Sequence, residues 1–157
     1  MRSSSRAVNR AAGRVALALL ALALGTIPSA SAQADEPKGP IQVEVTVVFV
    51  SPSPGKVDPR ARKFDRLLSK KLRYGSLRVI ESSRRRVALD QVESVKLPSG
   101  GRLQFRPLDL GKKGVLLAVE AQGMAQGDFR LRKGKPMILG GAPYEDGQIS
   151  VILEADY

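Results

Sequence analysis

The chain has 157 residues with no His and no Cys, and its 26 basic residues outnumber its 15 acidic residues to give a net charge of +11. Without His and Cys, the chain has no disulfides, no cysteine-linked lipid, no Ser–His or Cys–His nucleophile pair and none of the usual zinc ligand sets. Aromatic residues make up only 4% of the chain, which disfavours stacking on nucleic-acid bases.

Residues 1–34 have the order of a secretory signal peptide. Four arginines and no acidic residue stand in the first 14 positions, and residues 15–24 form an unbroken apolar run of ten. Small residues follow, with Ala-Ser-Ala and Ala-Gln-Ala as candidate cleavage triplets at 30–34. Because a membrane-spanning helix needs about 20 apolar residues, this run is too short to span. We therefore expect cleavage and export to the periplasm or the exterior; an uncleaved anchor is the alternative.

The charge persists after the expected cleavage. Residues 1–34 contain four basic and no acidic residues, so the remaining chain has a net charge of +7. This excess favours anionic partners such as lipid head groups, acidic glycans or acidic protein surfaces. The alternative is that the charge only keeps an exported domain soluble. No nucleic acid is expected as a partner, and contact with the membrane is expected only through the signal segment before cleavage.

The folded part is expected to begin after a polar linker at residues 35–40, as a single domain at 41–157. Its first strand is predicted at 41–50, where every second residue is apolar and shares one face of the strand. The opposite face begins with polar residues and becomes apolar at Val48 and Val50. The far end of this strand should therefore be covered on both sides.

One helix is predicted, from Pro59 to Arg73. Asp58 can accept hydrogen bonds from the free backbone N–H groups at the start of the helix, and Pro59 suits its first turn. Gly75 follows the last apolar residue of the helical pattern, where a left-handed C-terminal cap is common. Basic residues fill much of the remaining helix surface. The apolar residues at helical spacing are Phe64, Leu67, Leu68 and Leu72.

The rest of the domain is predicted to consist of short strands, many of which alternate between apolar and polar residues. They are expected at residues 77–80, 87–89, 92–97, 102–106, 115–122, 128–132, 137–139 and 148–155. Such alternation indicates antiparallel sheets with one buried and one solvated face. Turn signals lie between them at 98–101 and 111–114.

Helix length limits the architecture. A helix of about 15 residues is about 22 Å long and covers only two or three strands spaced about 4.8 Å apart. The remaining strands must bury their apolar faces against one another. The sequence therefore predicts a mainly β domain with one helix (α+β): a two-layer antiparallel sandwich or partly closed barrel with one amphipathic helix packed on it. A single open sheet is the alternative.

Catalytic motifs are weak. Ser53-Pro54-Gly55-Lys56 has the spacing of Ser-x-x-Lys enzymes, but Pro-Gly forms a turn where that chemistry needs a helical turn. The acidic pair Glu145-Asp146 lacks the ligand spacing of a calcium loop. We therefore predict a non-enzymatic protein with no catalytic, cofactor-binding or metal-binding residues. A hydrolase that uses carboxylates, or a Ser/Lys dyad assembled from distant residues, is the alternative.

Arginines are the main candidates for binding. If they converge on one surface, they form a patch for an anion or an acidic partner; if they scatter, they are ordinary solvated charges. We expect the consecutive triplet to lie at a turn or at the start of a strand, and the others within strands. The candidates are Arg84, Arg85, Arg86, Arg102, Arg106, Arg130 and Arg132.

A second candidate is the segment ILGGAPYEDGQISVIL at residues 138–153. Its glycines lack the spacing of a phosphate-binding loop and no helix follows, whereas Asp146-Gly147 predicts a hairpin turn between two strands. The residues of a possible partner loop in this segment are Gly140, Gly141, Pro143 and Tyr144. If Tyr144 folds back onto the core, the loop is structural; if it points outward, the loop is a place for a partner.

Three stretches of the domain, LRYGSLR at 72–78, LPSGG at 97–101 and GGAPYEDG at 140–147, resemble uncharacterised small exported bacterial proteins. The resemblance covers most of the mature domain and implies no known activity and no functional residues. We expect an exported, non-enzymatic module that binds a protein or an anionic envelope component, accessory to an envelope or secretion assembly. The alternative is a structural envelope protein.

Overall fold

The structure is a computed structural model that describes residues 39–157, and the predicted signal peptide lies outside the described residues. The described chain forms two four-stranded antiparallel sheets. Sheet A, in the order β2-β1-β8-β7, contains β1 (Ile41–Ser51), β2 (Ser76–Val87), β7 (Met137–Tyr144) and β8 (Gly147–Asp156). Sheet B, in the order β3-β4-β5-β6, contains β3 (Glu93–Lys96), β4 (Arg102–Gly111), β5 (Gly114–Ala121) and β6 (Ala125–Leu131).

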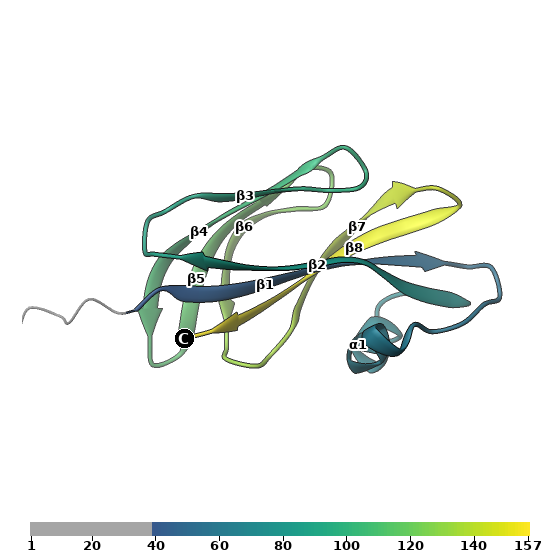
Figure 1. Cartoon of the computed structure of the whole chain (residues 1–157), viewed down its shortest axis with the longest axis horizontal. Helices are drawn as coiled ribbons and strands as arrows, with labels where there is room; N and C mark the ends of the chain where they lie inside the picture. The colour runs from purple at the N-terminus through teal and green to yellow at the C-terminus, as the bar shows by residue number, and fades with distance from the viewer. Residues whose placement is uncertain (1–38) are drawn as a thin grey trace, which may run out of the picture. The chain divides into compact units, whose positions relative to one another are not determined.

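The two sheets face each other as the layers of a sandwich (Figure 1). Strands that are consecutive in the chain are neighbours within each sheet, and β1 and β8 are also neighbours in sheet A. No ladder joins β2 to β3 or β6 to β7. Residues 39–157 therefore form a β-rich sandwich with one short helix and no closed barrel. The prediction of a mainly β, two-layer antiparallel fold is confirmed.

The core between the sheets follows from the alternation in β1. Ile41, Val43, Val45, Val47 and Phe49 are all buried in one cluster with residues of β4, β5 and β8. On the opposite face of sheet A, a second cluster contains the remaining apolar residues of β1. The predicted covering of the far end of β1 on both sides is confirmed.

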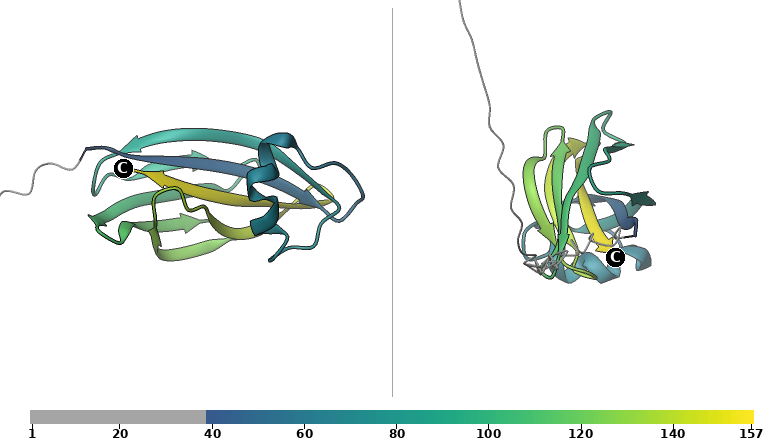
Figure 2. Two further views of the ribbon diagram at one scale, coloured as in Figure 1. Left: turned by 90° about the horizontal axis from the view of Figure 1, so that it is seen from below. Right: turned by 90° about the vertical axis from the view of Figure 1, so that its left-hand side faces the viewer.

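The second cluster includes the helical segment, which comprises a 3-10 turn η1 (Pro59–Ala61) and helix α1 (Arg62–Leu68). Phe64 and Leu68 of the helix are buried beside Val48 and Ile152 of sheet A. In the left view of Figure 2, α1 lies across β1 and β8. The helix thus covers the face of sheet A that points away from sheet B.

The helix is shorter than predicted. It ends at Leu68 rather than Arg73, because the chain turns there and brings Leu72 and Tyr74 back onto the second cluster. The Tyr74 hydroxyl donates to the carboxylate of Asp65 over 2.6 Å and fixes this return. Burial and this hydrogen bond raise the pKa of Tyr74. Gly75 is not the predicted left-handed cap; a Cβ there would lie 2.6 Å from the carbonyl oxygen of Ser53, so the close approach of the chain requires Gly.

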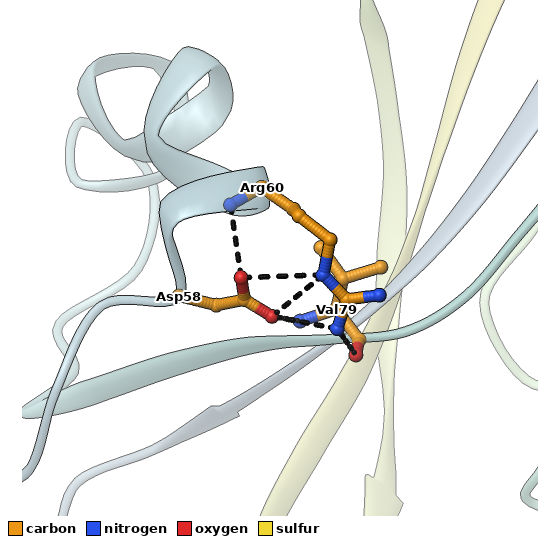
Figure 3. Close-up of polar contacts among 3 residues, drawn as sticks. All are labelled: Asp58, Arg60 and Val79. Carbon is orange, nitrogen blue, oxygen red and sulfur yellow. Dashed lines mark hydrogen bonds and ion pairs between the residues drawn. The ribbon is translucent and has the colours of Figure 1, made fainter.

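The start of the helical segment is tied to β2 by Asp58 (Figure 3). As predicted, the Asp58 carboxylate caps the segment, accepting from the backbone N–H of Arg60 over 2.9 Å, and it also accepts from the backbone N–H of Val79 over 3.2 Å. The Arg60 guanidinium donates to the same carboxylate over 2.9 Å and to the Val79 carbonyl over 3.2 Å. These hydrogen bonds, those from Arg60 above all, lower the pKa of Asp58 to about 2 and raise that of Arg60.

The lowered pKa of Asp58 predicts a loss of stability in acid. The carboxylate stabilises the fold above its ordinary pKa of 3.8, and this contribution disappears as pH falls towards about 2. Asp58→Asn keeps a capping oxygen but removes the titration, so the variant should lose less stability than the wild type over this window. Urea unfolding at pH of about 5 and about 2 measures the difference. An equal loss in both proteins would show that Asp58 does not carry the acid sensitivity.

Two predicted boundaries are wrong. The strand expected at 77–80 continues to Val87 as β2, while Ala88 and Leu89 of the strand expected at 87–89 lie beyond its end, so the arginine triplet lies within a strand rather than at a turn or strand start. The last hairpin is present, but β7 continues through Tyr144 and the two-residue turn is Glu145-Asp146, with Glu145 at φ 50°. Gly147 already belongs to β8 and lies opposite Tyr144. The position requires Gly because a Cβ there would collide with the carbonyl oxygen of Val50.

Candidate anion-binding groove

The arginine triplet divides between the two faces of sheet A. Arg84 lies opposite Glu44 on β1, and its Nε is 3.3 Å from that carboxylate. Arg86 lies opposite Gln42 on the same outer face. Two further ion pairs, Lys63–Glu154 at 2.6 Å and Lys133–Asp156 at 2.6 Å, balance the charge nearby. The pKa of Asp156 is lowered by its hydrogen bond from Lys133. Three of these four cations are thus each paired with a carboxylate, and only Arg86 has no ion pair with another described residue.

Arg85 points the other way and joins the edges of the two sheets. It lies opposite Val43, on the inner face, and its Nε is 3.5 Å from the carboxylate of Glu93 on β3. All three arginines belong to β2, an edge strand of sheet A. Charges on an edge strand oppose pairing with a strand of another molecule. The triplet therefore disfavours the addition of a further strand at this edge.

Arg102 and Arg106 lie on the outer face of sheet B among acidic residues. The register of β4, β5 and β6 puts Arg106, Ala118 and Asp128 side by side in one row. The small side chain of Ala118 contributes to a depression of about 280 Å³, whose lining also includes Glu120. Because both signs of charge surround it, this face does not select an anion. The seven candidate arginines do not form one patch.

Arg130 and Arg132, in contrast, belong to a groove of about 290 Å³ with a one-sided charge, called the basic groove below. Its cationic side chains are those of Lys71, Arg130, Arg132 and Lys135. Its apolar side chains include Leu67, Met137 and Ile138. None of the described residues lining the groove is acidic.

Two distant parts of the chain form the basic groove. One wall is the end of α1 and the turn after it, which contribute Leu67 and Lys71. The other wall is the connection from β6 in sheet B to β7 in sheet A. This connection turns at Gly134, with φ 65°, and the N–H of Lys135 donates to the carbonyl of Arg132 over 3.0 Å. The turn thereby fixes the backbone that carries both basic residues.

The cations of the basic groove differ in how far they are neutralised. Arg130 donates to the carbonyl oxygen of Gly114 over 3.1 Å and lies 3.5 Å from the carboxylate of Asp109. The side chains of Lys71, Arg132 and Lys135 are exposed, and none forms a hydrogen bond or ion pair with another described residue. Three cations therefore remain available to an anion.

The floor of the basic groove is partly buried and lies where the two apolar clusters approach each other. Met137 packs against the core between the sheets, and Ile138 packs against the cluster under the helix. Leu67 is partly buried on the helix side. Cationic side chains thus surround an apolar surface that the fold itself leaves partly uncovered.

Neither protein-family models, nor curated proteins, nor solved structures give a match. The function has to be inferred from the residues of the chain itself.

The predicted partner loop is part of the hairpin. The ring of Tyr144 packs edge-on against Phe49, with centroids 6.0 Å apart and an interplanar angle of 74°. Pro143 is exposed within β7, while a Cβ at Gly140 would lie 2.9 Å from the Met124 carbonyl and one at Gly141 would lie 2.6 Å from the side-chain oxygen of Gln148. Because Tyr144 folds back, these residues have a structural role and no separate loop is formed.

The Ser-x-x-Lys stretch lines a different depression, of about 340 Å³, together with Ser51 and Asp146. The Ser51 hydroxyl donates to Asp146 over 3.1 Å, and its oxygen accepts from the N–H of Ser53 over 3.2 Å. Within residues 39–157 no hydrogen bond joins Lys56 to a serine. The arrangement therefore lacks the contact that would activate a serine nucleophile.

Among residues 39–157, no group of three or more acidic side chains is placed to hold a metal ion. Neither η1 nor α1 has the length and apolar character of a membrane-spanning helix.

Lys71, Lys135 and the apolar floor were not among the predicted site residues. The segment RLRKGKP at 130–136 contains four basic residues in seven positions, and this density could have directed attention to Lys135. No comparable sequence pattern links Lys71 to this segment, because Lys71 and Lys135 line the same groove only through the placement of the helix beside the β6–β7 connection.

Proposed function

We propose that the protein is an exported, non-enzymatic module that binds an anionic lipid head group of the cell envelope through the basic groove. Export rests on the sequence of residues 1–34, and the setting is accessory to an envelope assembly. The observation that carries the proposal is the set of three unpaired cations, Lys71, Arg132 and Lys135, around a groove without a described acidic residue.

The chemistry of these side chains suits phosphate. An arginine guanidinium presents a planar set of donors that matches two phosphate oxygens, while a lysine ammonium acts as a mobile point charge. The turn at Gly134 holds Arg132 and Lys135 on one side of the basic groove, and Lys71 faces them from the helix side. An anion in the groove would therefore meet donors from both walls.

The size of the basic groove favours a head group over a folded protein as the ligand. Small-ligand sites have volumes of about 300 to 1,000 Å³, and the groove, at about 290 Å³, lies near the lower end. A standard protein interface buries about 800 Å² on each partner, much of it flat. Assembly through strand addition is also opposed at the β2 edge by its arginines.

Vesicle binding by two arginine variants tests the proposal. Each basic residue close to an anionic membrane contributes about 1 kcal/mol, so Arg132→Ser should weaken binding to vesicles of phosphatidylglycerol and phosphatidylcholine about fivefold. Arg106→Ser removes the same charge from the mixed face of sheet B and should leave binding nearly unchanged. Phosphatidylcholine vesicles should bind neither variant nor the wild type. Co-sedimentation measures all three, and equal effects of the two variants would overturn the assignment to the groove.

A further inference from the structure

We infer that the basic groove binds a single anionic lipid molecule by its head group together with the first part of one acyl chain, so that the protein recognises a dispersed, single-chain anionic lipid. This inference rests on the proposed function and adds to it the apolar half of the ligand. The inference follows from the apolar floor of the groove. Attraction to a charged membrane surface alone would not require such a floor.

The floor provides the surface for an acyl chain. Leu67, Met137 and Ile138 are only partly buried, and Met137 and Ile138 each lie at the margin of a packed cluster. Of the other described residues lining the groove, Leu131 and Pro136 are apolar as well. A phosphate alone would leave this surface in water, whereas an acyl chain would cover it.

The cationic and apolar side chains of the basic groove together suit an amphiphilic ligand. Lys71 is on the helix side and Arg132 and Lys135 are on the connection, and apolar side chains line the same groove. Charge complementarity therefore favours an anionic head group, and the apolar floor favours an acyl chain attached to that head group. With a volume of about 290 Å³, the groove holds a head group and part of a chain but not a whole two-chain lipid.

The contribution of the floor can be stated as a ratio of affinities. Burying one methylene group changes affinity by a factor of about four, from about 0.8 kcal/mol. If two or more methylenes lie on the floor, a single-chain anionic lipid should bind at least about tenfold more tightly than its head group alone. A groove that recognises only charge would bind the two equally.

Calorimetric titration of the full chain with three soluble probes tests this inference. The probes are lysophosphatidylglycerol below its micelle concentration, glycerophosphoglycerol as the head group alone, and lysophosphatidylcholine as the same chain with a zwitterionic head. We expect lysophosphatidylglycerol to bind at least about tenfold more tightly than either of the others. Equal affinity for lysophosphatidylglycerol and glycerophosphoglycerol would overturn the inference and leave the proposed function standing. Loss of charge-dependent vesicle binding would overturn the proposed function itself.

Variants of the floor and of the rim should separate the two contributions. Leu67→Ser and Met137→Gln should reduce the preference for lysophosphatidylglycerol over glycerophosphoglycerol severalfold, while Arg132→Ser should weaken the binding of both probes alike. Amide chemical shifts provide an independent measurement in the wild type, since the lysolipid should perturb residues 67, 137 and 138. Shifts confined to the outer face of sheet B, or floor variants that fold and keep the full preference, would contradict the inference.

Discussion

Replacing Lys71, Arg132 and Lys135 together by Ser is expected to weaken binding to anionic vesicles by about two orders of magnitude. Each residue near the surface contributes about 1 kcal/mol, and every 1.4 kcal/mol changes the affinity about tenfold. These three cations have no described partner in the protein, so removing them should leave no buried charge unpaired. Co-sedimentation across a range of lipid concentrations measures the change.

The matched control is the triple variant Lys56→Ser, Lys112→Ser and Lys113→Ser. These lysines are exposed and lie outside the basic groove, and their loss lowers the net charge by the same amount. If binding depends only on the total charge of the protein, both triple variants will lose affinity equally, which contradicts a groove. If the groove carries binding, added salt should weaken the wild type and the control far more than the groove variant.

Phe64→Ala is expected to lower the free energy of unfolding by about 3 to 5 kcal/mol, which is typical of a large aromatic side chain removed from a core. Phe64 is 1% exposed and belongs to the cluster that joins α1 to sheet A. The helix also carries one wall of the basic groove. The variant should therefore lose lipid affinity as well as stability. Urea unfolding followed by circular dichroism measures the first effect.

A surface variant provides the comparison. Val92 is 62% exposed, so Val92→Ala should change stability by less than about 0.5 kcal/mol. A similarly small effect of Phe64→Ala would mean that the helix is not anchored through its aromatic residue. An unchanged vesicle affinity in folded Phe64→Ala would separate the helix from the binding site.

Local patterns in the sequence predicted local structure well. The alternation in β1 identified the residues that face sheet B, because a strand has a side-chain period of two. Asp58 and Pro59 identified the start of the helical segment, because a cap acts on adjacent backbone groups. The predicted end of the helix was wrong, because the actual end depends on a tertiary contact of Tyr74 with Asp65 and on the cluster beneath them.

The sequence pattern could not predict features that depend on how distant segments pack against one another. Gly147 has the sequence signature of a turn residue, but it pairs with Tyr144 as the first residue of β8 and must be Gly because Val50 lies close to it. The arginines could be assigned to faces only once the register of β2 and of sheet B was known. The basic groove joins Lys71 to Lys135, and no spacing rule connects residues that far apart in the chain.

The place of β8 in sheet A has a consequence for the time at which the protein can fold. This strand, from residues 147–156, lies between β1 and β7 and is therefore interior to a sheet whose first strand begins at Ile41. Its pairing with β1 closes the longest span of sequence in the domain, which is the slowest kind of contact to form. A chain that crosses a membrane from its N-terminal end would hold β1 without its central neighbour until residue 156 had passed. The sandwich would then assemble only after translocation, so transport in an unfolded state is compatible with the topology itself.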